Sequence, residues 1–178
     1  MSPGPLVLAA LAATLALCAA AGEPAWQTAP LPPEAAQFNR EAETAADPAA
    51  AANLYARAIR ACPSNGPALY GLGRALLVQD RAADSLKVFR RLDSLFPDDP
   101  ATLEALAAAS ARLPEPRRAD IAAGLGWAER AAQLAPGSPT AFHILSVLRH
   151  LNGDYALAAE AARQAVALDT QNPSDPET

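Results

Sequence analysis

Apolar residues recur along this chain with the spacing of helices that each bury one face. In the segment 66–78 they stand at Leu69, Leu72, Leu76 and Leu77, and the segment 82–95 carries a similar stripe. Residues separated by three or four positions lie on one side of an α-helix, so both segments predict amphipathic helices. Sustained alternation of apolar and polar residues, which marks a half-buried strand, does not occur.

Residues that favour helix starts divide this pattern into segments. Asp47 stands directly before a proline, a pairing that suits an N-cap followed by the first helical position. We interpret Asp80, Ser138 and Asp154 as further starts. Eight helices are therefore expected, near residues 33–46, 48–61, 66–79, 81–95, 100–112, 117–134, 139–151 and 154–168.

The helical segments also form an internal repeat. One motif places two small residues, an aromatic residue and a proline at fixed intervals, first at Ala51, Tyr55, Ala58 and Pro63. Looser copies end at residues 97, 136 and 170, so successive copies are offset by 34, 39 and 34 residues. A repeated helical hairpin cannot bury its apolar face alone, and stacking of its neighbours completes the core.

A 34-residue period with these positions resembles the tetratricopeptide repeat, a helix–turn–helix unit. The fourth copy matches most closely, with Asn152-Gly153-Asp154-Tyr155 at the turn between its helices. The third copy has a five-residue excess near residues 113–116, which predicts a longer turn. The resemblance implies an all-α, right-handed superhelical solenoid of about four hairpins, at residues 32–65, 66–99, 100–138 and 139–172.

The N-terminal segment has the features of an export signal. Its apolar run at 6–21 matches a signal-peptide core and falls short of the ~20 residues that a membrane span needs. We expect a signal peptide at 1–22, cleaved after Ala21 or Gly22, then a linker at 23–31 and a disordered tail at 173–178. The protein is thus predicted to be exported, either periplasmic or secreted.

Two alternatives for this segment stay open. The residues before the apolar run include no Lys or Arg, so the segment could instead remain as a membrane anchor. The sequence Leu15-Ala16-Leu17-Cys18 resembles a bacterial lipobox, which implies acylation of Cys18, although Leu17 departs from the small residue of that motif. Cleavage would leave Cys62 alone, and a single cysteine forms no internal disulfide.

Charge and composition exclude several functions. The net charge is −5 and the pI is near 5.0, with one lysine, so the chain lacks the basic footprint of a nucleic-acid-binding protein. No catalytic, cofactor-binding or metal-binding constellation is found. His143 and His150 are seven residues apart on one helix, roughly 10 Å along its axis, which is too far to share one metal ion. We expect no enzyme activity.

The resemblance also implies a binding groove, because the first helix of each tetratricopeptide hairpin lines the concave face of the array. Carried over by repeat position, the predicted groove residues are Arg40, Glu43, Tyr70, Arg74, Leu77, Glu104, Arg112, His143, Val147 and His150. Arg40 and Arg74 share one repeat position, so their guanidinium groups would face one groove and bind a carboxylate, with Tyr70 as an apolar anchor. The alternative is that these side chains only solvate an exposed helix face.

These inferences predict an exported scaffold that holds a peptide or protein partner in its concave groove, within an envelope assembly or a secretion system. The alternative is an oligomerisation module that associates through its terminal hairpins. The last hairpin is expected to expose mostly alanine, and therefore little apolar area. The identity of the partner does not follow from the sequence.

Overall fold

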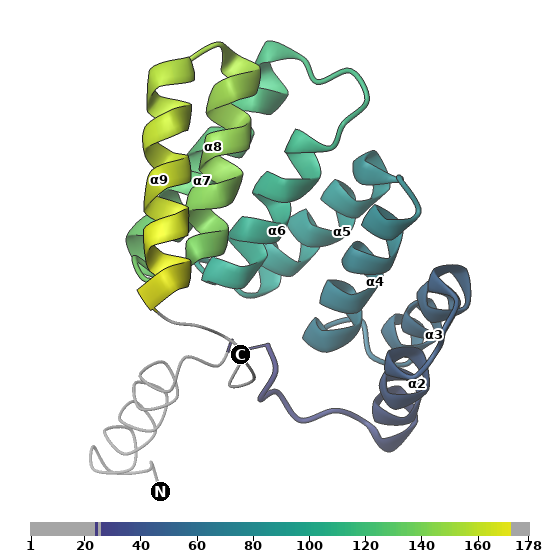
Figure 1. The fold of residues 1–178 in the computed structure, drawn as a ribbon. Helices are drawn as coiled ribbons and strands as arrows, with labels where there is room; N and C mark the ends of the chain where they lie inside the picture. Colours follow the sequence, from purple (N-terminus) through teal and green to yellow (C-terminus); the bar gives the residue numbers. More distant parts are fainter. Residues whose placement is uncertain (1–23, 25, 172–178) are drawn as a thin grey trace, which may run out of the picture.

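The computed structural model describes residue 24 and residues 26–171 of the chain. Within these residues it contains eight α-helices and no β-strand: α2 (Pro33–Glu43), α3 (Pro48–Ala61), α4 (Gly66–Val78), α5 (Ala82–Leu95), α6 (Pro100–Ala111), α7 (Arg118–Leu134), α8 (Pro139–Asn152) and α9 (Tyr155–Gln171). Four antiparallel hairpins stack in chain order into a curved row (Figure 1). The predicted all-α superhelical fold is confirmed, and each helix end lies within three residues of its expected position.

The expected signal peptide at 1–22, with Cys18, and the expected tail at 173–178 lie outside the described residues. Among the helices of the described part, none is both long and apolar enough to cross a membrane.

Side-chain caps explain where several helices begin. The carboxylate of Asp47 accepts hydrogen bonds from the backbone N–H groups of residues 49 and 50, at 3.2 and 3.0 Å. Asn65, Asp99 and Ser138 each accept one from the backbone three residues on. A proline at the first or second position follows each of these four caps, where its missing N–H costs nothing. The predicted starts at Asp47 and Ser138 are confirmed.

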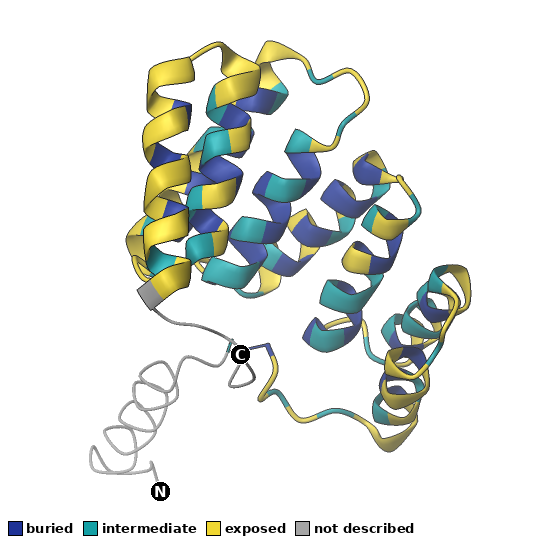
Figure 2. Cartoon of the chain, in the orientation of Figure 1, coloured by how far each residue is buried: buried dark blue, intermediate teal, exposed yellow. Residues whose placement is uncertain are grey.

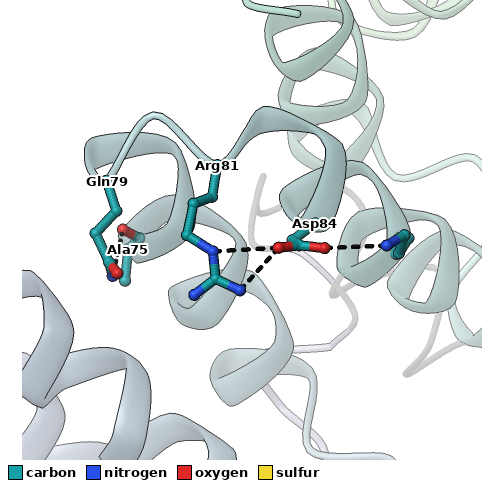
Figure 3. Close-up of polar contacts among 5 residues, drawn as sticks. Ala75, Gln79, Arg81 and Asp84 are labelled. Atoms are coloured by element: carbon teal, nitrogen blue, oxygen red, sulfur yellow. Dashed lines mark hydrogen bonds and ion pairs between the residues drawn. The ribbon is translucent and has the colours of Figure 1, made fainter.

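The start predicted at Asp80 is wrong. Asp80 has a φ of 56° and belongs to the turn, while α5 begins at Ala82 with Arg81 as its N-cap residue. Figure 3 shows the Arg81 guanidinium directed at Asp84, with Nη2 2.7 Å from Oδ2. Lys87 donates to the other oxygen of that carboxylate at 3.0 Å. These hydrogen bonds hold the pKa of Asp84 below its usual range and place a negative charge in the first turn of α5.

The same turn also contacts the preceding hairpin. Gln79 follows the last residue of α4, and its side-chain amide donates to the Ala75 carbonyl at 3.0 Å (Figure 3). The same amide donates to the Pro48 carbonyl at 3.1 Å. Pro48 begins α3, so this one amide joins the end of α4 to the start of a helix in the first hairpin.

The core lies between the two helix layers and is built from small residues facing large ones. The fully buried ring of Phe89 packs against Gly73, and the Ser85 hydroxyl donates to the Gly73 carbonyl at 2.8 Å. Gly124 likewise faces the buried Ser110. Figure 2 shows the buried positions following the inner faces of the hairpins from α2 to α8. Small residues at these helix crossings therefore set the close spacing of the helices.

The third hairpin contains the predicted longer turn. Residues 112–117 connect α6 to α7, whereas four, three and two residues connect the helices of the first, second and fourth hairpins. Figure 1 shows this connection as an extended loop.

Candidate functional site

The second hairpin carries three of the ten predicted groove residues on α4. Tyr70 and Leu77 of α4 are half-buried and pack against the core, while Arg74 is exposed between them in sequence. The Tyr70 ring also approaches the ring of Phe89, with centroids 5.8 Å apart. Core packing therefore fixes the position of the Tyr70 ring, the predicted apolar anchor.

Arg74 acts on aromatic side chains from two hairpins. Burial raises the pKa of Tyr55 on α3, the nearby charge of Glu43 raises it further, and Arg74 lowers it. Burial also raises the pKa of Tyr70, which Arg74 lowers and Glu104 raises. Side chains from α2, α3, α4 and α6 therefore share one electrostatic environment on this face.

Glu104 of α6 is held at the neighbouring position. Its Oε1 accepts a hydrogen bond of 2.6 Å from the hydroxyl of Ser138, the N-cap residue of α8. Burial raises the pKa of Glu104, the Ser138 hydrogen bond lowers it, and the charge of Asp99 raises it. Of the two predicted groove residues of the third hairpin, Glu104 is thus tied into the array, while Arg112 is exposed just after the end of α6.

The remaining predicted residues lie toward the two ends of the array. Arg40 and Glu43 are exposed in the last turn of α2. His143 is exposed on α8, and Val147 and His150 line a separate hollow of 440 Å³ with residues of α9. Val147 and His150 therefore border the hollow between α8 and α9, whereas Tyr70, Arg74 and Glu104 lie on α4 and α6.

That end of the array is more apolar than predicted. Tyr155, Leu157 and Val166 of α9 are 66%, 48% and 64% exposed, and Val147 and Leu151 of α8 are exposed beside them. The expectation of a mostly alanine face with little exposed apolar area is wrong. The alanines do line the hollow, but large apolar residues stand around them.

Trp26 is a residue of the concave side that the sequence pattern did not indicate. It precedes α2, in the segment expected to be a linker, yet it is only 4% exposed. Its indole stacks on Tyr70 with ring centroids 4.8 Å apart and an interplanar angle of 21°. Residues 26–32 lead from this contact to the start of α2 (Figure 1). An isolated tryptophan has no periodic neighbours, so no helical or strand pattern could identify it.

Asp99 is the hydrogen-bond acceptor for the indole N–H of Trp26. Its Oδ2 accepts from Trp26 Nε1 at 2.9 Å, from the backbone N–H of Thr102 at 2.8 Å and from the Thr102 hydroxyl at 2.6 Å. Asp99 is only 8% exposed, because its carboxylate is enclosed by Trp26 and the start of α6. Asp98 is exposed and pairs with Arg130 at 3.0 Å. The proline after Asp99 was the one local signal for its capping role.

A second buried polar contact joins the first two hairpins. The side-chain amides of Asn39 and Asn65 donate to each other's oxygens at 3.1 and 3.2 Å, and both residues are buried. Asn65 also caps α4, so this pair fixes α2 against the start of α4.

Among the described residues, no group of three or more His, Cys, Asp and Glu side chains could hold a metal ion.

Comparisons with known proteins agree with this architecture. Residues 40–100 match the family model described as tetratricopeptide repeat, and no curated protein matches the chain. Among solved structures, a MamA RS-1 ArsTM double mutant superposes with a TM-score of 0.67 at 19% identity, covering 80% of this chain and 79% of that one.

Two further solved structures are similar. TTC0263, a thermophilic TPR protein of Thermus thermophilus, gives a TM-score of 0.65 at 21% identity over 75% of this chain and 72% of that one. MamA 41-end from Desulfovibrio magneticus RS-1 gives 0.68 at 18% identity, with coverages of 79% and 78%. At these identities the similarity shows a shared fold.

Proposed function

We propose that this chain is a scaffold that holds a peptide or protein partner on its concave face, because residues 40–100 match the tetratricopeptide repeat model and the whole array shares its fold with solved proteins of that architecture. One observation carries the proposal: the half-buried ring of Tyr70 and the exposed Arg74 lie one turn apart on α4, and Glu104 is held by Ser138 on α6, the next first helix. An aromatic surface beside a guanidinium group suits a peptide that offers both an apolar side chain and a carboxylate. We include Arg40, one repeat before Arg74, in the same groove.

Charge reversal tests this assignment. The partner is first identified by affinity purification of the protein from its native cell envelope followed by mass spectrometry. Binding of that purified partner is then measured for Arg40→Glu, Arg74→Glu and the control Arg60→Glu, which changes an exposed arginine on the second helix of the first hairpin. We expect the groove variants to lose the partner while their helicity, followed by circular dichroism, stays unchanged. Undiminished binding by both groove variants would refute the groove assignment.

We further propose that the scaffold works outside the cytoplasm, in an envelope assembly or a secretion system, and that residues 1–22 direct its export. The support is the signal-like apolar run at 6–21. N-terminal sequencing of the protein isolated from its own cells should give a first residue near Glu23. A chain that keeps Met1, or one that is acylated at Cys18, would replace cleavage with one of the two anchoring alternatives.

The open face of the last hairpin supports a second candidate function, self-association. At the repeat positions of Tyr155, the second and third hairpins have Ala82 and Ile121, which are 2% and 8% exposed. Both belong to second helices that contact the first helix of the next hairpin, so the corresponding face of α9 has the shape to receive another helix. No large apolar residue is exposed on α2 or α3, so two copies would meet through this end of each array.

Two exposed valines provide a matched test of self-association. Val166 lies on α9 and is 64% exposed, while Val78 lies at the end of α4 and is 65% exposed. Val166→Ser should shift a dimer toward monomer in sedimentation velocity, and Val78→Ser should not. A wild-type chain that sediments as a monomer at high micromolar concentration would reject this candidate.

A further inference from the structure

Trp26 of the N-terminal segment fills a pocket that residues of α4 and the start of α6 form on the concave side of the array. We define the tryptophan pocket as Gly66, Tyr70 and Asp99, which contact the backbone and Cβ, the ring face and the N–H of Trp26. Gly66 is essential to the fit, because a Cβ at this position would lie 2.3 Å from Cβ of Trp26 and 2.9 Å from its carbonyl oxygen. The pocket therefore fits both the side chain and the backbone of the segment.

The pocket selects tryptophan by polarity as well as by shape. Asp99 is nearly buried, and its Oδ2 is the acceptor for the indole N–H. A phenylalanine could stack on Tyr70 but could not donate this hydrogen bond, and a buried acceptor that loses a donor weakens binding. The two contacts together favour an indole over other aromatic side chains.

Trp26 is the most deeply placed residue of the segment. Among residue 24 and residues 26–32, Trp26 alone is buried, whereas Gln27, Pro30 and Pro32 are exposed. Figure 2 shows most of this stretch as exposed or intermediate. Trp26 lies in a turn, in which the backbone N–H of Gln27 donates to the carbonyl of Pro24 at 2.9 Å. A second peptide that offers a tryptophan in a similar turn would compete with the segment for the same contacts.

We propose that the segment around Trp26 is a tethered ligand of the tryptophan pocket, and that in trans the pocket binds a proline-flanked peptide that carries a tryptophan in a turn. The inference rests on the proposed function, because the pocket shares Tyr70 with the concave face. A tethered ligand competes at an effective concentration of about millimolar. The pocket is therefore largely closed to weak ligands until the tethered tryptophan leaves it.

A direct test uses the full chain and a fluorescein-labelled peptide of residues 23–33 as the probe, with binding measured by fluorescence anisotropy. Trp26→Ala empties the pocket and should bind the probe at least tenfold more tightly than the wild type. Replacing the tryptophan of the probe with alanine, or adding Tyr70→Ala to the Trp26→Ala chain, should weaken that binding at least tenfold. Trp127→Phe, which changes the other tryptophan of the chain, should leave binding at the wild-type level.

A second variant tests displacement without altering the tryptophan. In a Trp127→Phe background the emission of Trp26 is the only tryptophan signal. Gly66→Ala should shift this emission to the red, because the new Cβ expels the segment. The matched control Gly126→Ala, whose Cβ meets nothing within 4 Å, should not change it.

Three results would overturn the proposal. The first is loss of helicity in Trp26→Ala, which would make Trp26 a fixed part of the core. The second is a folded Trp26→Ala chain that binds the probe no better than the wild type. The third is unchanged emission in Gly66→Ala. The scaffold assignment is tested by a different measurement, the binding of the purified partner by Arg40→Glu and Arg74→Glu. The two sets of experiments therefore distinguish a wrong pocket proposal from a wrong groove assignment.

Discussion

Gly73→Ala should destabilise the array even though alanine is the better helix former. An added Cβ would lie 2.4 Å from Cε1 and 2.5 Å from Cζ of Phe89. Carbon atoms in favourable contact are about 3.5–4.0 Å apart, so one side must move by about an ångström. The Phe89 ring is fully buried, and the hydrogen bond from Ser85 holds the Gly73 carbonyl on the other side. Neither partner has free space to move into.

The magnitude follows from two opposing effects. Overpacking of this kind costs about 1–3 kcal/mol. Alanine in place of glycine inside a helix returns about 0.5–1 kcal/mol. We therefore expect a net loss of about 1–2 kcal/mol in the free energy of unfolding, which lowers the melting temperature of a domain of this size by about 2–8 °C.

Thermal and urea unfolding followed by circular dichroism would measure this loss, with Gly126→Ala as the control. Gly126 lies within α7 and has open space at its Cβ position, so its substitution should stabilise the chain by about 0.5–1 kcal/mol. Adding Phe89→Leu to Gly73→Ala removes the clashing ring atoms, and the pair should show a favourable coupling energy of about 0.5–3 kcal/mol. If Gly73→Ala is as stable as Gly126→Ala, close packing at Gly73 does not limit stability.

Two further predictions concern polar groups. Burial raises the pKa of Glu104 in the folded chain, so stability should fall as pH rises through and above the ordinary glutamate range. Glu104→Gln keeps an acceptor for the Ser138 hydroxyl and should raise the melting temperature at pH 7. The gain should vanish below about pH 4, where the Glu104 carboxyl is protonated. A gain in melting temperature that does not depend on pH would contradict this reasoning. Asn39→Ala leaves the buried amide of Asn65 without its partner and should cost about 1–3 kcal/mol in urea unfolding. As a control, Asp47→Ala removes an exposed N-cap and should cost about 1 kcal/mol. If Asn39→Ala and Asp47→Ala lower the free energy of unfolding equally, the Asn39–Asn65 pair behaves as if it were exposed to solvent.

The helices were predictable because their causes are local. Apolar residues three and four positions apart define one face of a helix wherever they occur, and a cap with its following proline fixes the start within a few residues. Asp47 and Ser138 show both signals and begin helices as expected. Aspartate is common both at N-caps and in turns, so the sequence did not distinguish the two roles for Asp80. In the structure Asp80 has a left-handed backbone conformation and lies in the turn before α5.

The repeat period also carried information beyond single helices. Equal spacing along the chain places equivalent residues of successive hairpins at equivalent points of the stack. Tyr70, Arg74 and Glu104 were selected in this way, and the structure brings them into one electrostatic environment. The period identified the last hairpin as exposed but not which of its side chains point outward, so the exposed Tyr155 and Val166 were not foreseen.

The sequence by itself determined the hairpins, their order and the positions that face one another, since these depend on spacings of a few residues repeated along the chain. Only the tertiary structure decided what fills the concave side near Tyr70. The hydrogen bond between Trp26 and Asp99 joins residues 73 positions apart. Asp99 stands at the N-cap position of the repeat, but Trp26 belongs to no periodic pattern, and their contact exists because two stacked hairpins bring the start of α6 to the N-terminal segment. A contact created by stacking has no signature in the local sequence.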